Sequence, residues 1–204
     1  MSDEDASNNP ADQLTALVQS SRAGDRAAFE EVVRLTGRSL FARLYLETGD
    51  PHRAEDLAQE TFLLAWKRLR DLQDATKFPG WLASIAHRVV IDAARYDARK
   101  KRWAAIWTGA APAPARAVET IKDRAATPSE SAERDDERRR VLAALRSLPS
   151  EYREVLALRY LAGADVESIA QQTGVTVGSV RGLLQRGIKL LREAMEAGRW
   201  GSRG

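Results

Sequence analysis

One predicted helix near the end of the sequence carries its cations on a single side. Within residues 174–193, which read GVTVGSVRGLLQRGIKLLRE, helical spacing brings four side chains into one narrow arc: Arg181, Gln185, Lys189 and Arg192. Ser179 and Arg186 lie beside this arc, and apolar residues take the other half of the helix. Guanidinium, ammonium and amide groups arranged in this way bind phosphates and base edges. The pattern therefore predicts a helix that packs on a core and directs its other side at a negatively charged partner.

The residues just before this helix have the spacing of a helix-turn-helix. Ala170, Gly174 and Val180 stand where that motif needs a small residue at the helix contact, a glycine in the turn and an apolar residue that fixes the second helix. Asp165 and Thr176 are suited to cap the two helices, and a helix docked in this way enters the DNA major groove with its N-terminal half. An ordinary helical hairpin with a solvated basic side is the alternative. The residues expected to contact DNA are Thr176, Ser179, Arg181, Gln185, Arg186 and Lys189.

A second basic track follows Trp81 in the middle of the chain. The stripe consists of Trp81, Arg88, Asp92, Arg95, Arg99 and Arg102, and the adjoining apolar stripe of Leu82, Ile85, Val89, Ala93 and Tyr96. Such a track suits a single strand or a melted duplex end, because a base can stack on the indole while arginines follow the backbone. The same pattern also fits a tryptophan in the core and a solvated helix end whose cations face the negative pole of the helix dipole. Both interpretations are equally compatible with these residues alone.

A third feature is an acidic and polar face over residues 54–69 of the helix predicted to run from residue 51 to residue 72. Its buried arc is expected to hold Ala54, Leu57, Ala58, Thr61, Phe62, Leu64, Ala65 and Trp66. The opposite arc carries Asp56, Gln59, Glu60, Leu63 and Lys67. A leucine amid acidic and amide groups on an exposed face indicates a protein-docking patch, although single exposed leucines are also common on ordinary surfaces.

An all-α framework must position these segments. Apolar residues recur at helical spacing, alternating strand patterns are missing, and aromatic residues make up only 6% of the 204-residue chain. Residues 103–130 carry three of the seven prolines among alanines, which predicts a flexible linker between two helical domains. The domains are expected at residues 12–102 and, with the helix-turn-helix, at residues 131–196. A disordered tail over residues 1–11 and a C-terminal tail over residues 197–204 are expected to flank them.

Capping residues, glycines and a proline mark where the helices of the first domain begin and end. A helix capped by Asp25 is expected to end at Gly37, and a separate helix is predicted over residues 39–47, before the turn at Gly49. Pro51 suits the first position of the helix that follows.

Composition excludes several classes of protein. The chain has no cysteine and only two histidines, so thiolate metal sites and cysteine nucleophiles are excluded and no metal site is expected. Neither histidine has an evident catalytic partner and there is no phosphate-binding glycine loop, so we expect no cofactor and no enzymatic activity. With 32 basic against 29 acidic residues, the net charge is only +3, and polyanion binding depends on where the cations lie. No apolar run approaches the roughly 18 residues of a membrane span, which predicts a soluble, cytoplasmic protein without membrane insertion.

Taken in order, these segments resemble the extracytoplasmic-function group of the sigma-70 family, the smallest bacterial RNA polymerase sigma factors. Residues 24–69 and 78–102 are similar to sigma region two, and residues 148–193 to region four. The resemblance implies two helical domains joined by a linker that threads toward the polymerase active-site channel. It also implies an alternative sigma factor that binds core RNA polymerase, recognises the minus-ten and minus-thirty-five promoter elements and promotes strand opening. A helix-turn-helix regulator that binds an operator without polymerase is the alternative.

The resemblance assigns roles to individual residues of region two. The segment Asp-Leu-x-Gln-Glu over residues 56–60 corresponds to the surface that grips the clamp helices of the polymerase β′ subunit. The residues expected at this contact are Asp56, Leu57, Gln59, Glu60, Phe62, Leu63 and Trp66. The loop over residues 71–78 corresponds to the segment that captures a flipped base of the minus-ten element, and the helix after Trp81 to the part that holds the non-template strand. The residues expected at this DNA are Asp74, Thr76, Lys77, Phe78, Trp81, Arg88, Arg95 and Arg99.

For region four, the resemblance implies that residues 179–189 read the minus-thirty-five element. The expected partners are core RNA polymerase, through the β′ clamp helices and the β flap, and promoter DNA. An anti-sigma factor is a further expected partner, because family members are commonly held inactive by one.

Two departures from the family pattern concern DNA contacts. The start of the recognition helix often reads Gly-Thr-Val-Lys-Ser-Arg-Leu in the family, whereas residues 178–184 read Gly-Ser-Val-Arg-Gly-Leu-Leu here. Gly182 and Leu183 thus remove two polar contacts, and the glycine costs about 1 kcal/mol of helix stability. Arg88 stands where an asparagine is common, which favours electrostatic over base-specific contacts at that point.

Overall fold

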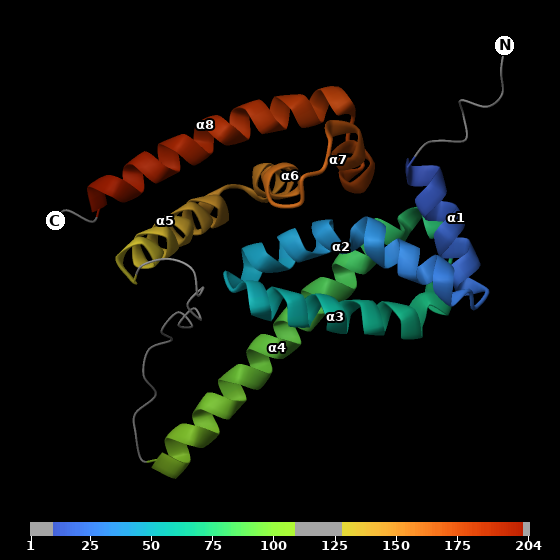
Figure 1. Ribbon diagram of the computed structural model, residues 1–204, viewed down its shortest axis with the longest axis horizontal. Helices are drawn as coiled ribbons and strands as arrows, with labels where there is room; N and C mark the ends of the chain where they lie inside the picture. Colours follow the sequence, from blue (N-terminus) through green and yellow to red (C-terminus); the bar gives the residue numbers. More distant parts are fainter. Residues whose placement is uncertain (1–9, 109–127, 202–204) are drawn as a thin grey trace.

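The computed structural model describes residues 10–108 and 128–201, with side chains described for residues 11–100 and 136–197. Within these ranges the chain forms helices and no strand, which confirms the predicted all-α fold (Figure 1). The elements are α1 (Pro10–Arg22), α2 (Arg26–Thr48), α3 (Pro51–Arg68), η2 (Leu69–Asp71), η3 (Ala75–Lys77), α4 (Phe78–Thr108), α5 (Pro128–Ser147), α6 (Ser150–Tyr160), α7 (Val166–Thr173) and α8 (Val177–Gly201). Helix α4 thus continues past the expected start of the linker at residue 103. Most of that linker, and the side chains of Trp103 and Trp107, lie outside the described residues.

The predicted N-caps begin three of these helices. They are Asp25, which accepts the backbone N–H of Ala28 at 3.1 Å, Asp165, which accepts that of Ser168 at 2.7 Å, and Thr176, which accepts that of Ser179 at 3.2 Å. Each such bond satisfies a donor that the helix itself cannot, and contributes about 1 kcal/mol. The bond from Ser168 also lowers the pKa of the Asp165 carboxyl below its ordinary value, because it favours the charged form. Pro51 occupies the first turn of α3, as predicted.

The predicted break at Gly37 is wrong, because α2 runs without interruption from Arg26 to Thr48. Val32 and Leu40, on either side of the glycine, are both buried in the core. Their packing offsets the cost of about 1 kcal/mol that a glycine imposes inside a helix. The helix ends instead at Gly49, which has a left-handed φ of 71° and donates its N–H to the Tyr45 carbonyl at 2.8 Å.

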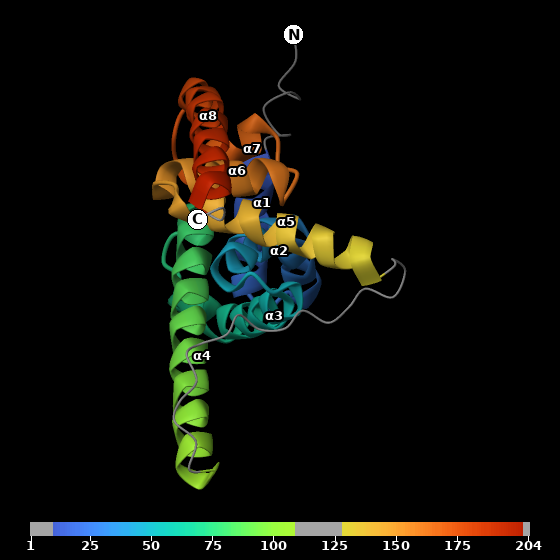
Figure 2. The same ribbon diagram turned by 90° about the vertical axis from the view of Figure 1, so that its left-hand side faces the viewer.

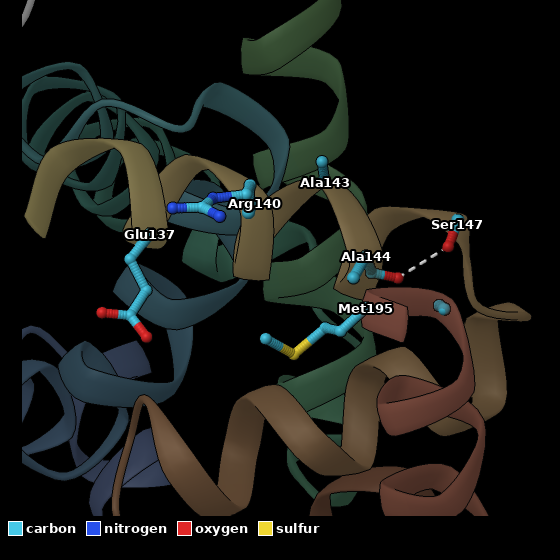
Figure 3. Close-up of a pocket in the computed structure, with 7 residues that line it drawn as sticks. Glu137, Arg140, Ala143, Ala144, Ser147 and Met195 are labelled. Atoms are coloured by element: carbon cyan, nitrogen blue, oxygen red, sulfur yellow. Dashed lines mark hydrogen bonds between the residues drawn. The ribbon is translucent and has the colours of Figure 1, made fainter. Parts of the chain in front are cut away.

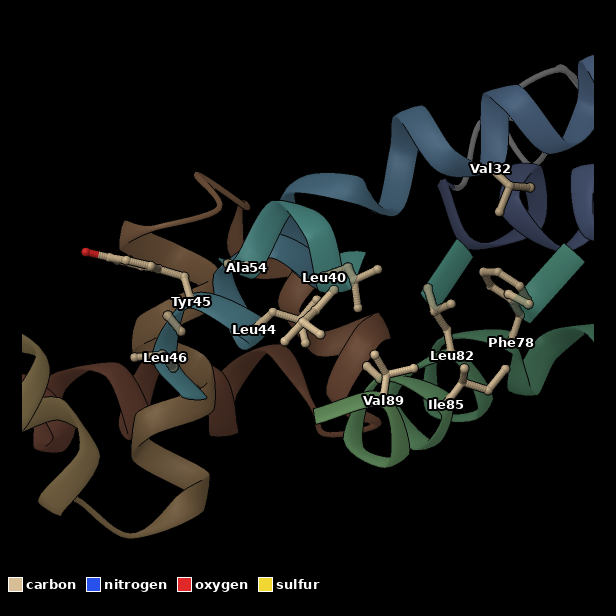
Figure 4. Close-up of a cluster of buried hydrophobic side chains, with 14 of the residues drawn as sticks. Val32, Leu40, Leu44, Tyr45, Leu46, Ala54, Phe78, Leu82, Ile85 and Val89 are labelled. Carbon is tan, nitrogen blue, oxygen red and sulfur yellow. The ribbon is translucent and has the colours of Figure 1, made fainter. Parts of the chain in front are cut away.

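The first domain is a bundle in which α1, α3 and α4 surround α2. Its core side chains come from facing sides of α2, α3 and α4, and Figure 4 labels Val32, Leu40, Leu44, Ala54, Phe78, Leu82, Ile85 and Val89 among them. Phe78, at the start of α4, is completely buried and thereby fixes where that helix leaves the preceding loop. The outward faces of α3 and α4 are therefore held by the same core.

Helix α4 extends well beyond this bundle (Figure 2). All residues from 94 to 100 are exposed, including Tyr96, whose side chain is 58% exposed. Tyr96 therefore lies on the apolar stripe of α4 but is exposed, because the helix has already passed the end of the surface on which that stripe packs.

The second domain consists of α5 to α8 and contains the predicted helix-turn-helix. Gly174 joins α7 to α8 with a left-handed φ of 73° and donates its N–H to the Ala170 carbonyl at 2.9 Å. Val180 is fully buried against Ile169 and Leu158. The turn glycine and the apolar anchor thus occupy the positions that the spacing indicated.

The two domains pack against each other through α2. Helices α5 and α6 lie against the C-terminal half of α2, and α7 contacts α1 and α4. Leucines of α5 and α6 join the buried cluster of the first domain, so a single apolar core spans both domains.

Two glycines in α8 should respond differently to substitution by alanine. At Gly182 an added Cβ would meet only the Arg186 guanidinium at 3.7 Å, whereas at Gly187 it would lie 3.2 Å from Leu156 Cδ1. Because both sites are helical, we expect Gly182→Ala to raise the free energy of unfolding by about 0.5–1 kcal/mol. We expect Gly187→Ala to give no such increase in the free energy of unfolding, because the added Cβ crowds Leu156 of α6. Urea unfolding of the full chain measures both, and an equal gain at the two positions would contradict the close packing of α8 on α6.

Candidate polymerase and DNA interfaces

Helix α3 presents an acidic and apolar face to solvent. Asp56, Gln59, Glu60 and Leu63 are all exposed, and Leu63 is 62% exposed. Among the described residues, neither Asp56 nor Glu60 takes part in an ion pair or a hydrogen bond. Beneath this face, Thr61 is completely buried and donates its hydroxyl hydrogen bond to the Leu57 carbonyl at 2.6 Å. The α3 face therefore offers two unpaired carboxylates around a projecting leucine on a firmly packed helix.

Leu57 was predicted both in the buried arc and at the polymerase contact. It is only 2% exposed and holds α3 on the core, which confirms the buried position and leaves little surface for a contact. Trp66 was expected in the buried arc, but it is 37% exposed and its ring packs against Phe29 with centroids 4.9 Å apart. Trp66 thus forms an edge of the α3 face. Phe62 is partly buried.

The loop before α4 is shaped by Asp74. Its Oδ1 accepts hydrogen bonds from the Thr76 hydroxyl at 2.6 Å and from the Thr76 N–H at 3.0 Å. The hydroxyl bond, followed by the backbone bond, lowers the pKa of the Asp74 carboxyl below its ordinary value. Lys77 Nζ lies 3.7 Å from Asp74 Oδ2. This small network caps η3, which forms one rim of a hollow.

An open hollow of about 630 Å³ lies beside this rim. It is lined by Asp71, Leu72, Gln73, Asp74, Lys77, Gly80 and Trp81. Trp81 is partly exposed and packs against Phe78 with ring centroids 5.9 Å apart. Phe78 itself was expected to contact DNA, but it is fully buried, and its ring lies under that of Trp81. The hollow combines a carboxylate, an ammonium group and an indole edge.

The basic track of α4 leads away from this hollow. Arg88, Arg95 and Arg99 are exposed, and only Arg95 forms an ion pair with a described residue, to Asp92 at 3.8 Å. Asp97 is instead paired with Arg53 of α3 at 3.0 Å, which ties α4 to α3 near the point where α4 projects. The side chain of Arg102 lies outside the described residues. A strand that entered the hollow would therefore meet cations along the same helix.

The polar side of α8 is open to solvent. Ser179, Arg181, Gln185, Arg186 and Lys189 are all exposed, and Thr176 is exposed at the cap, where its hydroxyl lies 2.9 Å from Ser179 Oγ. Val180 and Ile188 face inward, so the helix has the two sides that the sequence predicts.

Glu167 is a neighbour of this surface that the sequence pattern did not reveal. Its Oε1 lies 3.7 Å from Arg181 Nη2, across the turn between α7 and α8. Both side chains are more than half exposed, so the pair is weak and can be exchanged for a phosphate or a base. Only the first-turn acidic position of Glu167 in the predicted α7 could have suggested the contact.

A second hollow, of about 430 Å³, lies between α5 and α8 (Figure 3). Ala144, Ala194 and Met195 give it an apolar wall, while Glu137 and Arg140 lie at its other end. Ser147 donates its hydroxyl hydrogen bond to the Ala144 carbonyl at 2.7 Å and so stays out of the space. Nothing in the sequence spacing singled out this hollow, because its residues come from helices far apart in the chain.

The described ranges contain no cluster of three metal-ligating histidine, aspartate or glutamate residues. No helix there has the length and hydropathy needed to cross a bilayer.

Comparisons with known proteins match both halves of this arrangement. The family model Sigma-70 region 2 covers residues 21–100, which hold the α3 face and the α4 track. The model Sigma-70, region 4 covers residues 138–191, which hold the helix-turn-helix. The ECF RNA polymerase sigma factor SigE of Mycolicibacterium smegmatis is 32% identical over 191 residues, which cover 90% of this chain and 69% of the relative. The ECF RNA polymerase sigma factor SigW of Bacillus subtilis is 25% identical, with 87% and 94% covered.

A solved structure, of CnrH in complex with the cytosolic domain of CnrY, shares the fold. It has a TM-score of 0.52 and 24% identity, covering 91% of this chain and 99% of that one. Fold and surfaces together define a two-domain helical protein with a helix-turn-helix. The chain belongs to the sigma-70 family, in its extracytoplasmic-function group.

Two leucines of α3 test which side of the helix packs on the core and which side faces solvent. We expect Leu57→Ala to lower the free energy of unfolding by about 2–5 kcal/mol, because it removes a buried side chain. We expect Leu63→Ala to change it by less than about 0.5 kcal/mol, because that side chain projects into water. Chemical unfolding of both variants provides the measurement, and comparable losses would contradict the orientation of α3.

Proposed function

We propose that this sigma factor binds core RNA polymerase through α3, captures and opens the minus-ten element with the η3 loop and α4, and reads the minus-thirty-five element with α8. The observation that carries the proposal is the presence of three separate exposed surfaces in one chain, each chemically suited to a different part of that task. The protein acts without catalysing a reaction of its own, in the cytoplasm where the polymerase works.

The α3 face is the proposed polymerase contact. Asp56 and Glu60 have no partner among the described residues, so a cationic partner surface such as the β′ clamp helices would not have to displace an internal ion pair. Leu63 and the edge of Trp66 supply the apolar centre that stable protein interfaces need. In region four, the hollow between α5 and α8 is the proposed seat for the β flap, because its alanines and Met195 leave room for an apolar side chain.

The hollow beside Trp81 is the proposed receptor for a flipped base. Extrusion of a base from a duplex costs a few kcal/mol, which stacking on the indole and hydrogen bonds to the Asp74 network can offset. The remaining single strand would follow Arg88, Arg95 and Arg99 along α4, as phosphates follow cations in other single-strand grooves. Buried Phe78 and Leu57 act only by holding these surfaces in place.

The exposed side of α8 is the proposed reader of the upstream element. Ser179, Arg181 and Gln185 lie on the N-terminal half that enters a major groove, while Arg186 and Lys189 are placed for phosphates. Gly182 and Leu183 add no polar group between them. Specificity therefore falls on few side chains, of which Arg181 is the one suited to bidentate contact with guanine. An anti-sigma factor that covers the α3 face or α8 would hold the protein inactive.

Run-off transcription tests the core of the proposal. Purified core polymerase with this protein, on sheared DNA from the source organism, should give discrete new starts that share two upstream elements. Sequence-specific DNA binding by the protein alone, without any new starts, would instead identify an ordinary helix-turn-helix regulator.

Charge reversal on α3 should separate polymerase binding from folding. We expect Asp56→Lys with Glu60→Lys to abolish core polymerase binding, because two unpaired carboxylates become cations at the contact, while far-UV circular dichroism stays unchanged. Glu30→Lys with Glu151→Lys is the control, since it makes the same change in net charge at exposed sites on other helices. Unchanged affinity of the α3 variant in a pull-down would refute the assignment of this surface.

Loss of the indole should affect strand opening rather than promoter recognition. We expect Trp81→Ala to leave closed-complex formation nearly normal and to reduce the permanganate reactivity of thymines at the start site, because the stacking partner for the flipped base is gone. His87→Ala, at an exposed site on another side of α4, serves as the control. Full reactivity with Trp81→Ala would exclude the indole from the opening step.

A further inference from the structure

Glu167 places a carboxylate on the side of region four that is proposed to face DNA. Its Oε1 lies 3.7 Å from Nη2 of Arg181, and we call these two residues the turn pair because they meet across the turn between α7 and α8. Neither side chain has another ion pair or hydrogen bond with a described residue. The first helix of a helix-turn-helix crosses the phosphate backbone while the second enters the major groove. A carboxylate on α7 therefore repels the expected ligand, and its place beside the reading arginine requires a physical reason.

Buried neighbours fix both members of the turn pair. Asp165 caps α7 by accepting the Ser168 N–H at 2.7 Å, and Ile169 is completely buried. Glu167 precedes that isoleucine by two residues, or about 200° around the helix, and so points away from the core. Val180, immediately before Arg181, is also completely buried. The packing of the two helices thus brings the carboxylate and the guanidinium together.

Helix stability does not account for this pairing. A carboxylate in the first turn is favoured by the helix dipole, and Glu167 is the second residue of α7. Glu151, the second residue of α6, occupies the same position without an ion pair to any described residue. The dipole thus explains an acidic residue at this position of a helix, but not its placement against an arginine of the reading helix.

The turn pair also differs from the arginine contacts that join the two domains. Arg43 pairs with Glu154 of α6, while Arg138 and Arg146 of α5 donate hydrogen bonds to groups of α2. The side chains of Arg43 and Glu154 are only 28% and 34% exposed, as expected for an ion pair within an interface. In the turn pair the arginine is 68% and the glutamate 61% exposed. An ion pair this open to water contributes little to stability, and both of its members are accessible to DNA.

The chemistry of guanidinium gives the carboxylate a role in base selection. An arginine has five N–H donors, and bidentate contact with guanine uses two of them. Arg181 can therefore contact guanine and still donate to Glu167. If Arg181 turned to a phosphate instead, Glu167 would remain unpaired beside the polyanion. The carboxylate thus disfavours the contact that carries no sequence information, and specificity often depends on such a penalty.

We propose that Glu167 is a positioning residue for Arg181, which directs the guanidinium to a base edge and away from the backbone. The substrate of this selection is a guanine at one position of the upstream promoter element, so the inference rests on the proposed function. Gly182 and Leu183, which follow Arg181, offer no polar group in its place. Discrimination at that base pair therefore depends on the turn pair.

The test measures base preference with core polymerase and the full chain. Run-off transcription from one mapped promoter is compared with transcription from templates in which each base pair of the upstream element is substituted in turn. The variants are Glu167→Gln, Arg181→Ala and the two combined. Glu151→Gln is the matched control, because it removes the same charge from the same helical position of α6. Circular dichroism and melting verify that every variant is folded.

We expect Glu167→Gln to lower the preference for guanine severalfold at a single position, the one that Arg181→Ala also relaxes. In the Arg181→Ala background, Glu167→Gln should change the preference at no position, because the residue that it positions is gone. Glu167→Gln should also steepen the fall of log promoter affinity with log salt by about 0.9, since Arg181 then contacts one more phosphate. Glu151→Gln should match the unmodified chain in both measurements.

Three results would overturn this role of Glu167. One is an unchanged base preference in Glu167→Gln, and another is an equal loss at every position, which would indicate a structural effect on α7. The third is an effect on base preference that persists in the Arg181→Ala background, because it would show that Glu167 contacts a base itself. Absence of polymerase-dependent starts with the unmodified chain would instead refute the proposed function, and the selection that rests on it.

Discussion

The continuity of α2 is the constraint on which the rest of this molecule depends. A helix of 23 residues is about 35 Å long, which is enough to hold the first domain on its N-terminal half and to receive the second on its C-terminal half. A break at Gly37 would separate Val32 from Leu44 and leave no common frame for the two clusters. Apolar burial on both sides of Gly37 keeps α2 continuous, and the packing of the other helices on α2 determines where the exposed surfaces lie.

The buried residues hold the exposed residues in position, and the exposed residues form the candidate contact surfaces. Leu57, Thr61 and Phe78 are buried, and their packing determines where Leu63 and Trp81 point. The exposed groups in turn contribute little to stability, as expected for solvated charges. This separation lets the contact surfaces vary in sequence without loss of the fold, and it explains how a chain with a net charge of only +3 can carry concentrated cation tracks on α4 and α8.

Much of the fold could be predicted because it is encoded locally. Helix periodicity, the caps at Asp25, Asp165 and Thr176 and the glycine turn at Gly174 depend on residues a few positions apart, and all of these predictions were confirmed. The break at Gly37 was wrong because a weak local preference was outweighed by packing from distant helices. Resemblance to a family assigns a function to a motif as a whole and so placed Leu57 at the polymerase contact, whereas helix periodicity correctly predicted that Leu57 faces inward while its neighbour Asp56 faces out. The surface chosen for the α3 face was otherwise correctly placed on the exposed side of that helix.

The contacts between the domains were beyond sequence reasoning for a different reason. Arg43, Arg138 and Arg146 have no periodic signature that separates them from ordinary surface arginines, and their partners lie 93 to 111 residues away or are main-chain atoms. The projecting end of α4 differs from these interdomain contacts, because its charged residues are close together in the sequence. Its exposed Arg95, Arg99 and Lys100 lie within two turns of one another, while Asp92 and Asp97 are paired with Arg95 and Arg53. Added salt therefore screens repulsion and attraction on this end of α4 together, whereas at the contact between the domains it screens an attractive pair.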